Sequence, residues 1–412
     1  QDNTGNNTEQ NRICRIYDAG EDDVAVIGAG HAGIEAALAA ARLGRRVLLA
    51  ERSFLLGGLG TAGLVTYYLP ICDGTGRQVS FGLAEELLRL AVAEYYDGGN
   101  GADWLLHRAP DRKTRAAGGR FEVKYNPQLF AVAAEEALLA AGVGILYGVS
   151  AVAAETEGER ITAVMMEGKG GRFAVAPGMV VDASGDCDVA YFAGLPTVNY
   201  APGNHLAAWY YHTGGGAYTL KMMGMVDQTE EQKRANPYSE LSSRAFSGLT
   251  AEELSEMTCL SHASVLRDVR LHRKTDPAYE PATIATIPQV RMTRRLAGAR
   301  TLDEGEAHTY MAGSVGMVSD WRRRGPLWEV PYGTLYSPAC ANLTVAGRCT
   351  SVTDALWDVM RVIPCCSVTG QAAGTAAALA LNGDVRTLPL TDLQAALTAG
   401  GVVLHESDLT ED

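Results

Sequence analysis

The stretch Val24-Ala-Val-Ile-Gly28-Ala-Gly30-His-Ala-Gly33 decides the fold of this chain. A hydrophobic run leads into a G-x-G-x-x-G motif. The first glycine permits a tight strand-to-helix turn, the second lets backbone amides approach a pyrophosphate, and the third lets the following helix pack closely on the sheet. The N-terminus of that helix also offers free N–H groups and the positive end of its dipole to an anion. Taken alone, the motif is equally compatible with a glycine-rich turn that binds nothing.

A second hydrophobic run, Arg46-Val-Leu-Leu-Ala-Glu51, adds what the glycine motif lacks. Its terminal acid lies 18 residues after Gly33, close to the spacing expected of a carboxylate that binds an adenosine ribose. Strand, helix, strand and acid in this order predict a βαβ unit that binds an adenine dinucleotide, with His31 beside the cofactor rather than catalytic. The cofactor-binding residues predicted from this unit and from the glycine-rich loop after it are Gly28, Gly30, His31, Ala32, Gly33, Glu51, Arg52, Gly57 and Gly58.

The chain has 412 residues, of which 47% are hydrophobic and 20% are charged, and its formal net charge is −13. Such a composition is typical of a globular protein, and the length predicts two or three domains. An acidic chain without long Lys/Arg runs is a poor nucleic-acid binder, because neutralising phosphates supplies much of that affinity. No apolar run reaches the roughly 18 residues of a membrane span. We therefore expect a small-molecule substrate, with neither nucleic acid nor membrane as a partner.

Eight cysteines are scattered along the chain, and none forms a C-x-x-C pair or lies at zinc-ligand spacing from a histidine. No metal site is predicted. Scattered cysteines in a chain of this size favour a reducing compartment, so we expect a cytoplasmic protein. The adjacent Cys365 and Cys366 are interpreted as small buried residues near a helix start. Because the first dozen residues are polar and rich in Asn, we expect residues 1–20 to be a processed or disordered leader.

The rest of the chain contains two kinds of region, one with repeated strand–glycine–helix patterns and one without them. After the βαβ unit, alternating strands are expected at 145–153, 161–166 and 173–181, as a β-meander. Residues 196–340 are richer in Trp, Tyr, His and Met, and strand–glycine–helix punctuation returns at Leu343. We therefore expect an α/β protein. Its expected parts are a discontinuous Rossmann-type domain of parallel sheet, helices and β-meander (21–195 and 341–388), an inserted α+β substrate domain (196–340), and a C-terminal helix and tail (389–412).

Helix-start signals mark four further helices. Ser80 precedes an apolar stripe that predicts a helix over 83–95, and Asn126-Pro127 begin a helix that ends at Gly142. Thr250-Ala-Glu-Glu253 is a capping box for a helix to about His272, and Thr391-Asp-Leu-Gln394 caps a short final helix. Glycines in residues 97–120 predict a mobile loop there.

Five ordered motifs make the chain resemble the FAD-dependent oxidoreductases grouped with the heterodisulfide-reductase-like and fumarate-reductase-like flavoproteins. The matching segments are Asp23 to Gly33, Glu51 with Leu56-Gly-Gly58, Val181-Asp-Ala-Ser-Gly-Asp-Cys-Asp188, Asn342-Leu-Thr-Val-Ala-Gly-Arg348, and Arg361-Val-Ile-Pro with Thr369-Gly-Gln-Ala-Ala-Gly374. They cover the dinucleotide half well and residues 196–285 poorly. The late strand-Gly-Arg element also fits a long cofactor held over its whole length better than NAD.

The resemblance implies non-covalently bound FAD, with its pyrophosphate on the Gly28–Gly33 loop and its adenosine ribose on Glu51. It implies a contact of adenine with the meander, a turn that closes over the cofactor, and a flavin end held by a Gly-Arg turn and a helix. The N-terminus of that helix, expected at Gly370–Gly374, would stabilise negative charge on the reduced flavin. The residues so implied are Ala151, Ala183, Ser184, Gly185, Gly347, Arg348, Gly370, Gln371 and Ala372.

The segment from Gly30 to Arg42 also resembles the tRNA-uridine-modifying flavoproteins. Three features count against this alternative: the net charge of −13, the short chain, and a different loop after Glu51.

The inserted region holds the candidates for substrate chemistry. His205, His212 and His308 could each act as a base, because imidazole titrates near neutrality. His205 is preferred, since Pro202-Gly-Asn-His205 is a turn that could present the ring to a pocket. On a strand, Arg291 and Arg295 would share a face and could clamp a carboxylate. The alternatives are structural histidines and, for the arginines, a solvated basic strand or ion pairs with nearby acids. Trp321-Arg-Arg-Arg324 is interpreted as a surface turn.

We therefore predict His205, Arg291 and Arg295 as catalytic residues of an FAD-dependent oxidoreductase that transfers a hydride between a small organic substrate and FAD. An FAD-carrying electron-transfer subunit of a larger complex is the alternative. The sequence leaves open the substrate, the direction, the electron acceptor and whether the chain forms a homo-oligomer.

Overall fold

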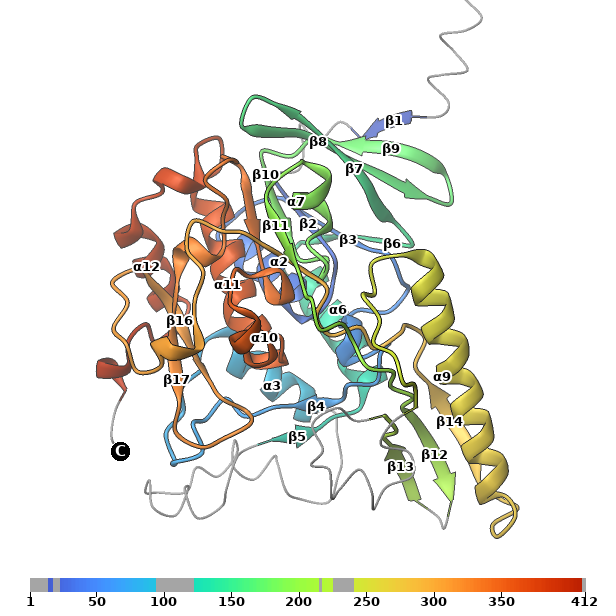
Figure 1. Cartoon of the computed structure of the whole chain (residues 1–412). Coiled ribbons are helices and arrows are strands. Elements are labelled where there is room, and N and C mark those ends of the chain that lie inside the picture. The colour runs from blue at the N-terminus through green and yellow to red at the C-terminus, as the bar shows by residue number, and fades with distance from the viewer. Residues whose placement is uncertain (1–13, 18–22, 94–121, 215–216, 225–240, 410–412) are drawn as a thin grey trace, which may run out of the picture. The chain divides into compact units, whose positions relative to one another are not determined.

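The computed structural model describes residues 14–17, 23–93, 122–214, 217–224 and 241–409. Contacts divide the chain into two compact units, whose elements are labelled in Figure 1. The large unit comprises residues 1–58, 66–198 and 294–412, and the small unit comprises residues 59–65 and 199–293.

A five-stranded parallel sheet lies at the centre of the large unit, in the order β18-β10-β2-β3-β6. Its strands are β2 (Val24–Ile27), β3 (Val47–Glu51), β6 (Gly144–Tyr147), β10 (Met179–Asp182) and β18 (Leu343–Val345). Every residue of β2, β3, β10 and β18 is buried, as expected of apolar strands in a sheet covered on both faces. The α/β class with a Rossmann-type parallel sheet is confirmed, and the chain returns to this sheet at β18.

Two helices rich in small residues pack on this sheet and on each other: α2 (His31–Arg42) and α11 (Ile363–Leu379). A Cβ at Gly370 would lie 2.4 Å from the carbonyl oxygen of Ala32, and a Cβ at Gly374 would lie 2.1 Å from that of Ala36. The two helix backbones therefore approach so closely that only glycine fits at these two positions of α11.

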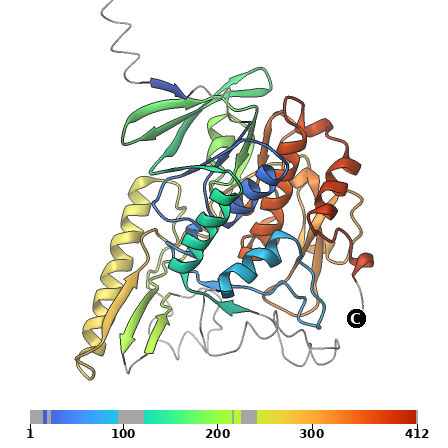
Figure 2. The same ribbon diagram turned by 180° about the vertical axis from the view of Figure 1, so that it is seen from behind.

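Helix α6 (Pro127–Ala140) begins as its sequence signal predicts, because the side chain of Asn126 accepts hydrogen bonds from the N–H groups of Gln128 and Leu129. Helix α3 (Leu83–Ala93) lies beside it, as the view from behind shows (Figure 2). The last two residues predicted for α3 and the loop predicted over 97–120 fall outside the described residues.

The predicted meander is present, but its outer strands are divided between two sheets. β7 (Ser150–Glu157), β8 (Arg160–Gly168) and β9 (Gly171–Val175) form the meander, whereas β6 and β10 belong to the parallel sheet. Gly148, with a φ of +68°, breaks the first predicted strand between β6 and β7. A fourth strand, β1 (Cys14–Tyr17), pairs in parallel with β9. The prediction of a leader over 1–20 was therefore wrong for residues 14–17, which extend an open sheet edge.

The small unit contains a three-stranded sheet and a long helix. The sheet has the order β13-β12-β14, formed by β12 (Tyr210–Gly214), β13 (Ala217–Lys221) and β14 (Glu280–Ile284). Helix α9 (Ala251–His272) begins where Thr250 accepts a hydrogen bond from the N–H of Glu253, as the sequence predicts.

Residues 294–340 differ from the predicted inserted region, because they belong to the large unit. The hairpin of β16 (Ser314–Ser319) and β17 (Leu327–Pro331) is fully buried and packs on α11. This hairpin has the composition of the inserted region but buries its apolar residues against the large unit, so composition alone placed the boundary too late.

The remaining elements are short. They are β4 (Tyr67–Tyr68), β5 (Val123–Lys124), α7 (Asp188–Phe192), β11 (Thr197–Asn199), β15 (Arg294–Leu296), α10 (Asp354–Met360) and α12 (Leu390–Ala399). Helix α12 follows Pro389 without a side-chain cap, so the predicted cap at Thr391 was wrong. Among the described helices none alone is long and apolar enough to cross a membrane; α10 and α11 pass this test only together, across a bend of 91°.

Candidate functional site

The loop between β2 and α2 is closed at both ends by glycines and open in its middle. Gly28 has a φ of +94°, and a Cβ there would lie 2.5 Å from the carbonyl oxygen of Ala183. A Cβ at Gly33 would lie 1.8 Å from the carbonyl oxygen of Gly28. At Gly30, by contrast, a Cβ would meet nothing within 4 Å. The loop is thus packed against its own fold at its ends and presents free space beside Gly30.

The N-terminus of α2 faces that space, and its N-cap residue, Gly30, makes no side-chain cap hydrogen bond. The first N–H groups of a helix have no partner within the helix, so here they are available to an anion. A second glycine loop lies alongside, since the N–H of Gly57 donates to the carbonyl oxygen of Ala29 at 2.7 Å. A Cβ at Gly58 would lie 3.2 Å from the Cα of Gly30.

Glu51 ends β3 next to this loop, and its carboxylate is buried. Its Oε2 accepts a hydrogen bond of 2.8 Å from the N–H of Ala29, and its Oε1 accepts two of 2.8 Å from the N–H and hydroxyl of Ser53. A carboxylate has about four lone-pair sites and three of them are used here, so Oε2 keeps one site that can accept from a hydroxyl such as that of a ribose. Arg52, which follows it, is exposed.

The turn after β10 meets the same edge of the sheet. The N–H of Ala183 donates to the carbonyl oxygen of Ile27 at 2.9 Å, which ties the turn to the end of β2. Asp182, fully buried beneath it, accepts hydrogen bonds from Ser184 and from the N–H of Ala190. Burial raises the pKa of Asp182, and these hydrogen bonds oppose the rise. Gly185 has a φ of +81°, and the Arg348 guanidinium fills the place of its side chain.

The turn after β18 completes this edge. The N–H of Gly347 donates to the Thr369 hydroxyl at 2.9 Å, and a Cβ at Gly347 would lie 2.9 Å from that of Ala32. Arg348 pairs with Asp186 at 3.5 Å. The loops after β2, β10 and β18 therefore converge at the carboxyl ends of three adjacent parallel strands, where open α/β sheets bind their ligands.

The predicted helix start at Gly370 was wrong. Helix α11 begins at Ile363, after Val362, so Gly370, Gln371 and Ala372 lie in its interior. Gly370 is used for packing on Ala32, as described above. The Gln371 side chain accepts a hydrogen bond from the N–H of Leu83 and donates one to the carbonyl oxygen of Gly400. The helix was expected to begin at its glycines, but Pro364 in the first turn is the residue that marks the start.

His31 turns its ring away from the loop and into the core. The ring stacks on Phe130 with centroids 4.8 Å apart, and Nε2 lies 3.3 Å from the hydroxyl of Tyr125. Burial lowers the pKa of His31 to about 3, so the ring is neutral near pH 7. What His31 offers at the loop is its backbone N–H. Ala151, the predicted adenine contact, lies half-buried in β7 opposite Met166.

The predicted catalytic residues have different surroundings. His205 is exposed, beside the buried Asn204. Arg291, in the small unit, lies over the ring of Trp209 at 5.5 Å. Arg295, in the large unit, pairs with Asp354 at 3.1 Å and lies over Trp357 at 5.2 Å. Strand β15 covers only Arg294–Leu296, so the expectation that Arg291 and Arg295 share a strand face was wrong.

The other two histidines that were weighed are engaged. His212 stacks on Tyr279 with centroids 4.4 Å apart, and His308 pairs with Glu406 at 2.9 Å. Sequence reasoning quoted Asp182 and Asp186 within a motif but gave them no role, although they hold the turn around Gly185. An acid that ends an apolar strand and another after the following glycine are the signal for that role. In the described part of the chain, no three His, Cys, Asp or Glu side chains gather as a metal site would require.

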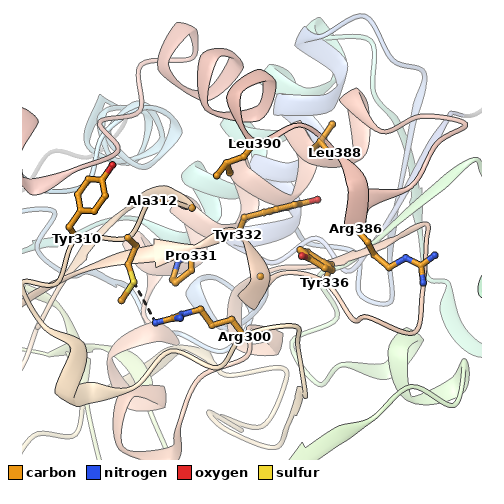
Figure 3. Close-up of a pocket in the computed structure, with 12 residues that line it drawn as sticks. Arg300, Tyr310, Ala312, Pro331, Tyr332, Tyr336, Arg386, Leu388 and Leu390 are labelled. Carbon is orange, nitrogen blue, oxygen red and sulfur yellow. Dashed lines mark hydrogen bonds between the residues drawn. The ribbon is translucent and has the colours of Figure 1, made fainter.

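A pocket of about 470 Å³ lies on the large unit beside β17 and α12, away from the glycine loops (Figure 3). Tyr332 and Tyr336 give it an aromatic wall, and two arginines lie at its edge. Both arginines are compensated, because Arg300 pairs with Glu306, and Arg386 pairs with Asp384 and Glu159. None of the predicted cofactor residues lines this pocket.

Comparison with known proteins identifies one family. The model of the family described as FAD dependent oxidoreductase matches residues 23–232 and 306–397, which is more than half of the chain. A stretch of 35 residues is 71% identical to the tRNA uridine 5-carboxymethylaminomethyl modification enzyme MnmG of Latilactobacillus sakei and 63% identical to that of Lactobacillus gasseri. Each of these matches covers only 8% of this chain and 6% of the relative.

Solved structures match a larger share of the chain at a lower sequence identity. BexE, from a study of oxidation in BE-7585A biosynthesis, has a TM-score of 0.42 and 16% identity, covering 92% of this chain and 63% of BexE. A geranylgeranyl bacteriochlorophyll reductase-like protein from Thermoplasma acidophilum has a TM-score of 0.41 and 13% identity, covering 92% and 82%. The flavin-dependent halogenase CmlS has a TM-score of 0.43 and 14% identity, covering 92% and 60%. Likenesses of this strength carry no information on activity.

Proposed function

Because the chain belongs to the FAD dependent oxidoreductase family, we propose that it transfers a hydride between a small organic substrate and non-covalently bound FAD. FAD is the cofactor of this family, and when bound it supplies the acceptor or donor of the two electrons. The observation that carries the proposal is the uncapped N-terminus of α2, with open space beside Gly30 and the fixed carboxylate of Glu51 next to it.

Each part of this edge suits one part of the dinucleotide. The N–H groups that begin α2 would bind the pyrophosphate, which is why no side chain stands at Gly30. Glu51 would accept hydrogen bonds from the adenosine ribose while Ala29 and Ser53 hold it in place. The turns at Gly185 and Gly347 would flank the remainder, and the Arg348 guanidinium lies against Gly185. No step of the binding requires a covalent link to the protein.

For the substrate, we assign proton transfer to His205, and we assign binding of an anionic or carbonyl group to Arg291 or, as a separate candidate, to Arg295. The His205 ring is exposed and has no hydrogen-bond partner among the described residues, so it is free to exchange a proton. The buried Nε of Arg295 also lacks a partner within the described part of the chain. A guanidinium with a spare N–H can donate a hydrogen bond to a carboxylate oxygen without giving up its pair with Asp354.

The electron-transfer subunit and tRNA modification remain weaker alternatives. The short matches to MnmG extend over 35 residues, and a net charge of −13 disfavours a polyanionic partner. An electron-transfer subunit would use the same FAD site but need no group for proton transfer.

The proposal is tested in two stages on the purified full chain. Heat-denatured protein is first analysed for the released nucleotide, which we expect to be FAD rather than FMN or NAD. Holoprotein is then mixed anaerobically with defined 2-hydroxy acids, alcohols and amines, and separately with NADH and NADPH. Hydride transfer predicts flavin bleaching by at least one of these, slowed when the transferred hydrogen is deuterium. Protein that dithionite reduces but none of these compounds bleaches would contradict hydride transfer and favour the electron-transfer subunit.

A further inference from the structure

Helix α2 carries a buried acid one turn behind the end that faces the dinucleotide. Glu35 is the fifth residue of α2, and none of its surface is exposed. With a rise of about 1.5 Å per residue, its backbone lies about 6 Å along the axis from His31. A charge on this side chain would therefore sit close to two phosphates bound at the helix N-terminus.

The hydrogen bonds of Glu35 satisfy only half of its carboxyl group. Oε1 accepts a hydrogen bond of 2.6 Å from the Ser367 hydroxyl, whose single proton has the carbonyl oxygen of Ile363, at 3.0 Å, as its other acceptor. Oε2 is buried and has no partner among the described residues, and neither has Nδ1 of His31. Nδ1 of His31 lies 4.0 Å from Oε1. An ionised carboxylate would leave a buried anionic oxygen without a donor, which is costly.

No cation compensates Glu35 from the described elements that pack on α2. The ionisable or polar groups that interact with it are His31 on its own helix, Ser367 and Cys366 on α11, and Tyr68. Tyr125 lies against His31. The charge of Arg348 lowers the pKa of Cys366. The acids of the neighbouring strands, Glu51 of β3 and Asp182 of β10, accept hydrogen bonds from the N–H groups of Ala29 and Ala190. Burial raises the pKa of Glu35 well above its ordinary value, while the bond from Ser367 lowers it.

We propose that the N-terminus of α2 binds the FAD pyrophosphate only while Glu35 is protonated, so that a proton inside the helix controls cofactor affinity. An ionised Glu35 would oppose the positive end of the helix dipole and repel the phosphates through a low-dielectric interior. By linkage, phosphates that favour the neutral acid raise its affinity for a proton by the same factor. Glu35 thus binds its proton more tightly in the FAD complex than in the apoprotein. In the pH range between the two titrations, the FAD dissociation constant rises with pH, by up to about tenfold per pH unit.

The test measures FAD binding to apoprotein and does not depend on hydride transfer, so it can fail separately from the proposed function. Quenching of flavin fluorescence gives the dissociation constant from about pH 6 to about pH 9. We expect it to rise with pH in the wild type and in the control Glu167→Gln, an exposed acid on β8, and to lose this rise in Glu35→Gln. Ser367→Ala should move the rise to higher pH, because its hydroxyl stabilises the carboxylate.

A second measurement reports the proton directly. Infrared spectra of apoprotein and holoprotein near pH 7 should contain a carboxylic-acid carbonyl band that is absent from Glu35→Gln and shifted in Ser367→Ala. The band and Ser367→Ala keep the proposal testable even if Glu35→Gln does not fold. Parallel pH profiles in wild type and Glu35→Gln, an unmoved rise in Ser367→Ala, or no such band in the wild type would each overturn it.

Discussion

The carbonyl oxygen of Gly28 lies where a side chain at Gly33 would begin, 1.8 Å from the position of a Cβ. The turn before α2 therefore packs directly against the first turn of that helix, and this contact fixes the orientation of the free N–H groups at the helix N-terminus. This contact connects the glycine spacing of the sequence to the shape of the cofactor site.

Gly33→Ala is expected to destabilise the apoprotein, because the backbone of the turn has to move to admit a methyl group. Overpacking of this kind costs about 1–3 kcal/mol of unfolding free energy. Urea unfolding of the apoprotein measures the loss. Gly170→Ala is the control, since a Cβ at Gly170 meets nothing within 4 Å. Equal stability of the two variants would mean that the turn is not packed as described.

Glu51→Gln is expected to weaken FAD binding by about 1–3 kcal/mol, because it removes a charge-assisted acceptor and presents an amide donor to the N–H of Ala29. Equilibrium dialysis of apoprotein with FAD measures the change. Glu157→Gln, at the exposed end of β7, is the matched control. Unchanged FAD retention in Glu51→Gln would show that the carboxylate does not hold the ribose.

His31 is expected to make the fold sensitive to acid. Its pKa is about 3 in the folded chain and near 6.5 when unfolded, so between these values only the unfolded chain binds the proton. Stability therefore falls as the pH drops below about 6.5, by up to about 1.4 kcal/mol per pH unit. Urea unfolding at several pH values from pH 7 to pH 5 measures how the free energy of unfolding depends on pH. This dependence should be weaker in His31→Gln than in the wild type or in the control His262→Gln, which replaces an exposed histidine of α9. Equal slopes would place the His31 ring in water.

His205→Ala is expected to lower the rate of flavin bleaching by substrate about 10²–10⁴-fold while the FAD content stays normal, if His205 moves the proton. Arg291→Ala should weaken substrate binding more than the bleaching rate at saturation. Single anaerobic turnovers with a compound that bleaches the wild-type flavin separate the effect on binding from the effect on the bleaching rate. Normal bleaching in both variants would leave the assignment without support.

The sequence predicted the parts of the fold whose residues permit one local structure. Val24–Ile27 and Val47–Glu51 are apolar runs beside a glycine motif, and Asn126 and Thr250 supply caps whose hydrogen bonds the structure contains. From these runs and caps the parallel sheet, α2, α6 and α9 followed. The position of Glu51 at the end of β3 followed as well, because it depends on spacing along one βαβ unit, and its role at the ribose stays a prediction.

The wrong predictions concern segments whose structure is determined by contacts with residues far away in the sequence. Residues 14–17 are a strand because the edge of β9 is open to pair with them, and residues 294–340 belong to the large unit because their hairpin packs on α11. The glycines of α11 were expected to mark a helix start at the flavin but serve the close approach of Ala32 and Ala36. The hydrogen bond of the buried Glu35 likewise comes from Ser367, 332 residues away, and no local pattern contains it.

Gly30→Ser tests most directly the central claim that the uncapped N-terminus of α2 is the FAD pyrophosphate site. Serine is a good N-cap, and the space beside Gly30 admits its side chain, so the apoprotein should keep its stability to within about 0.5 kcal/mol. The same hydroxyl would occupy the N–H groups and the space that the phosphates need. We predict an FAD dissociation constant at least about tenfold higher, a loss of about 1.4 kcal/mol, in an apoprotein of unchanged stability. Wild-type FAD affinity in this variant would contradict the account.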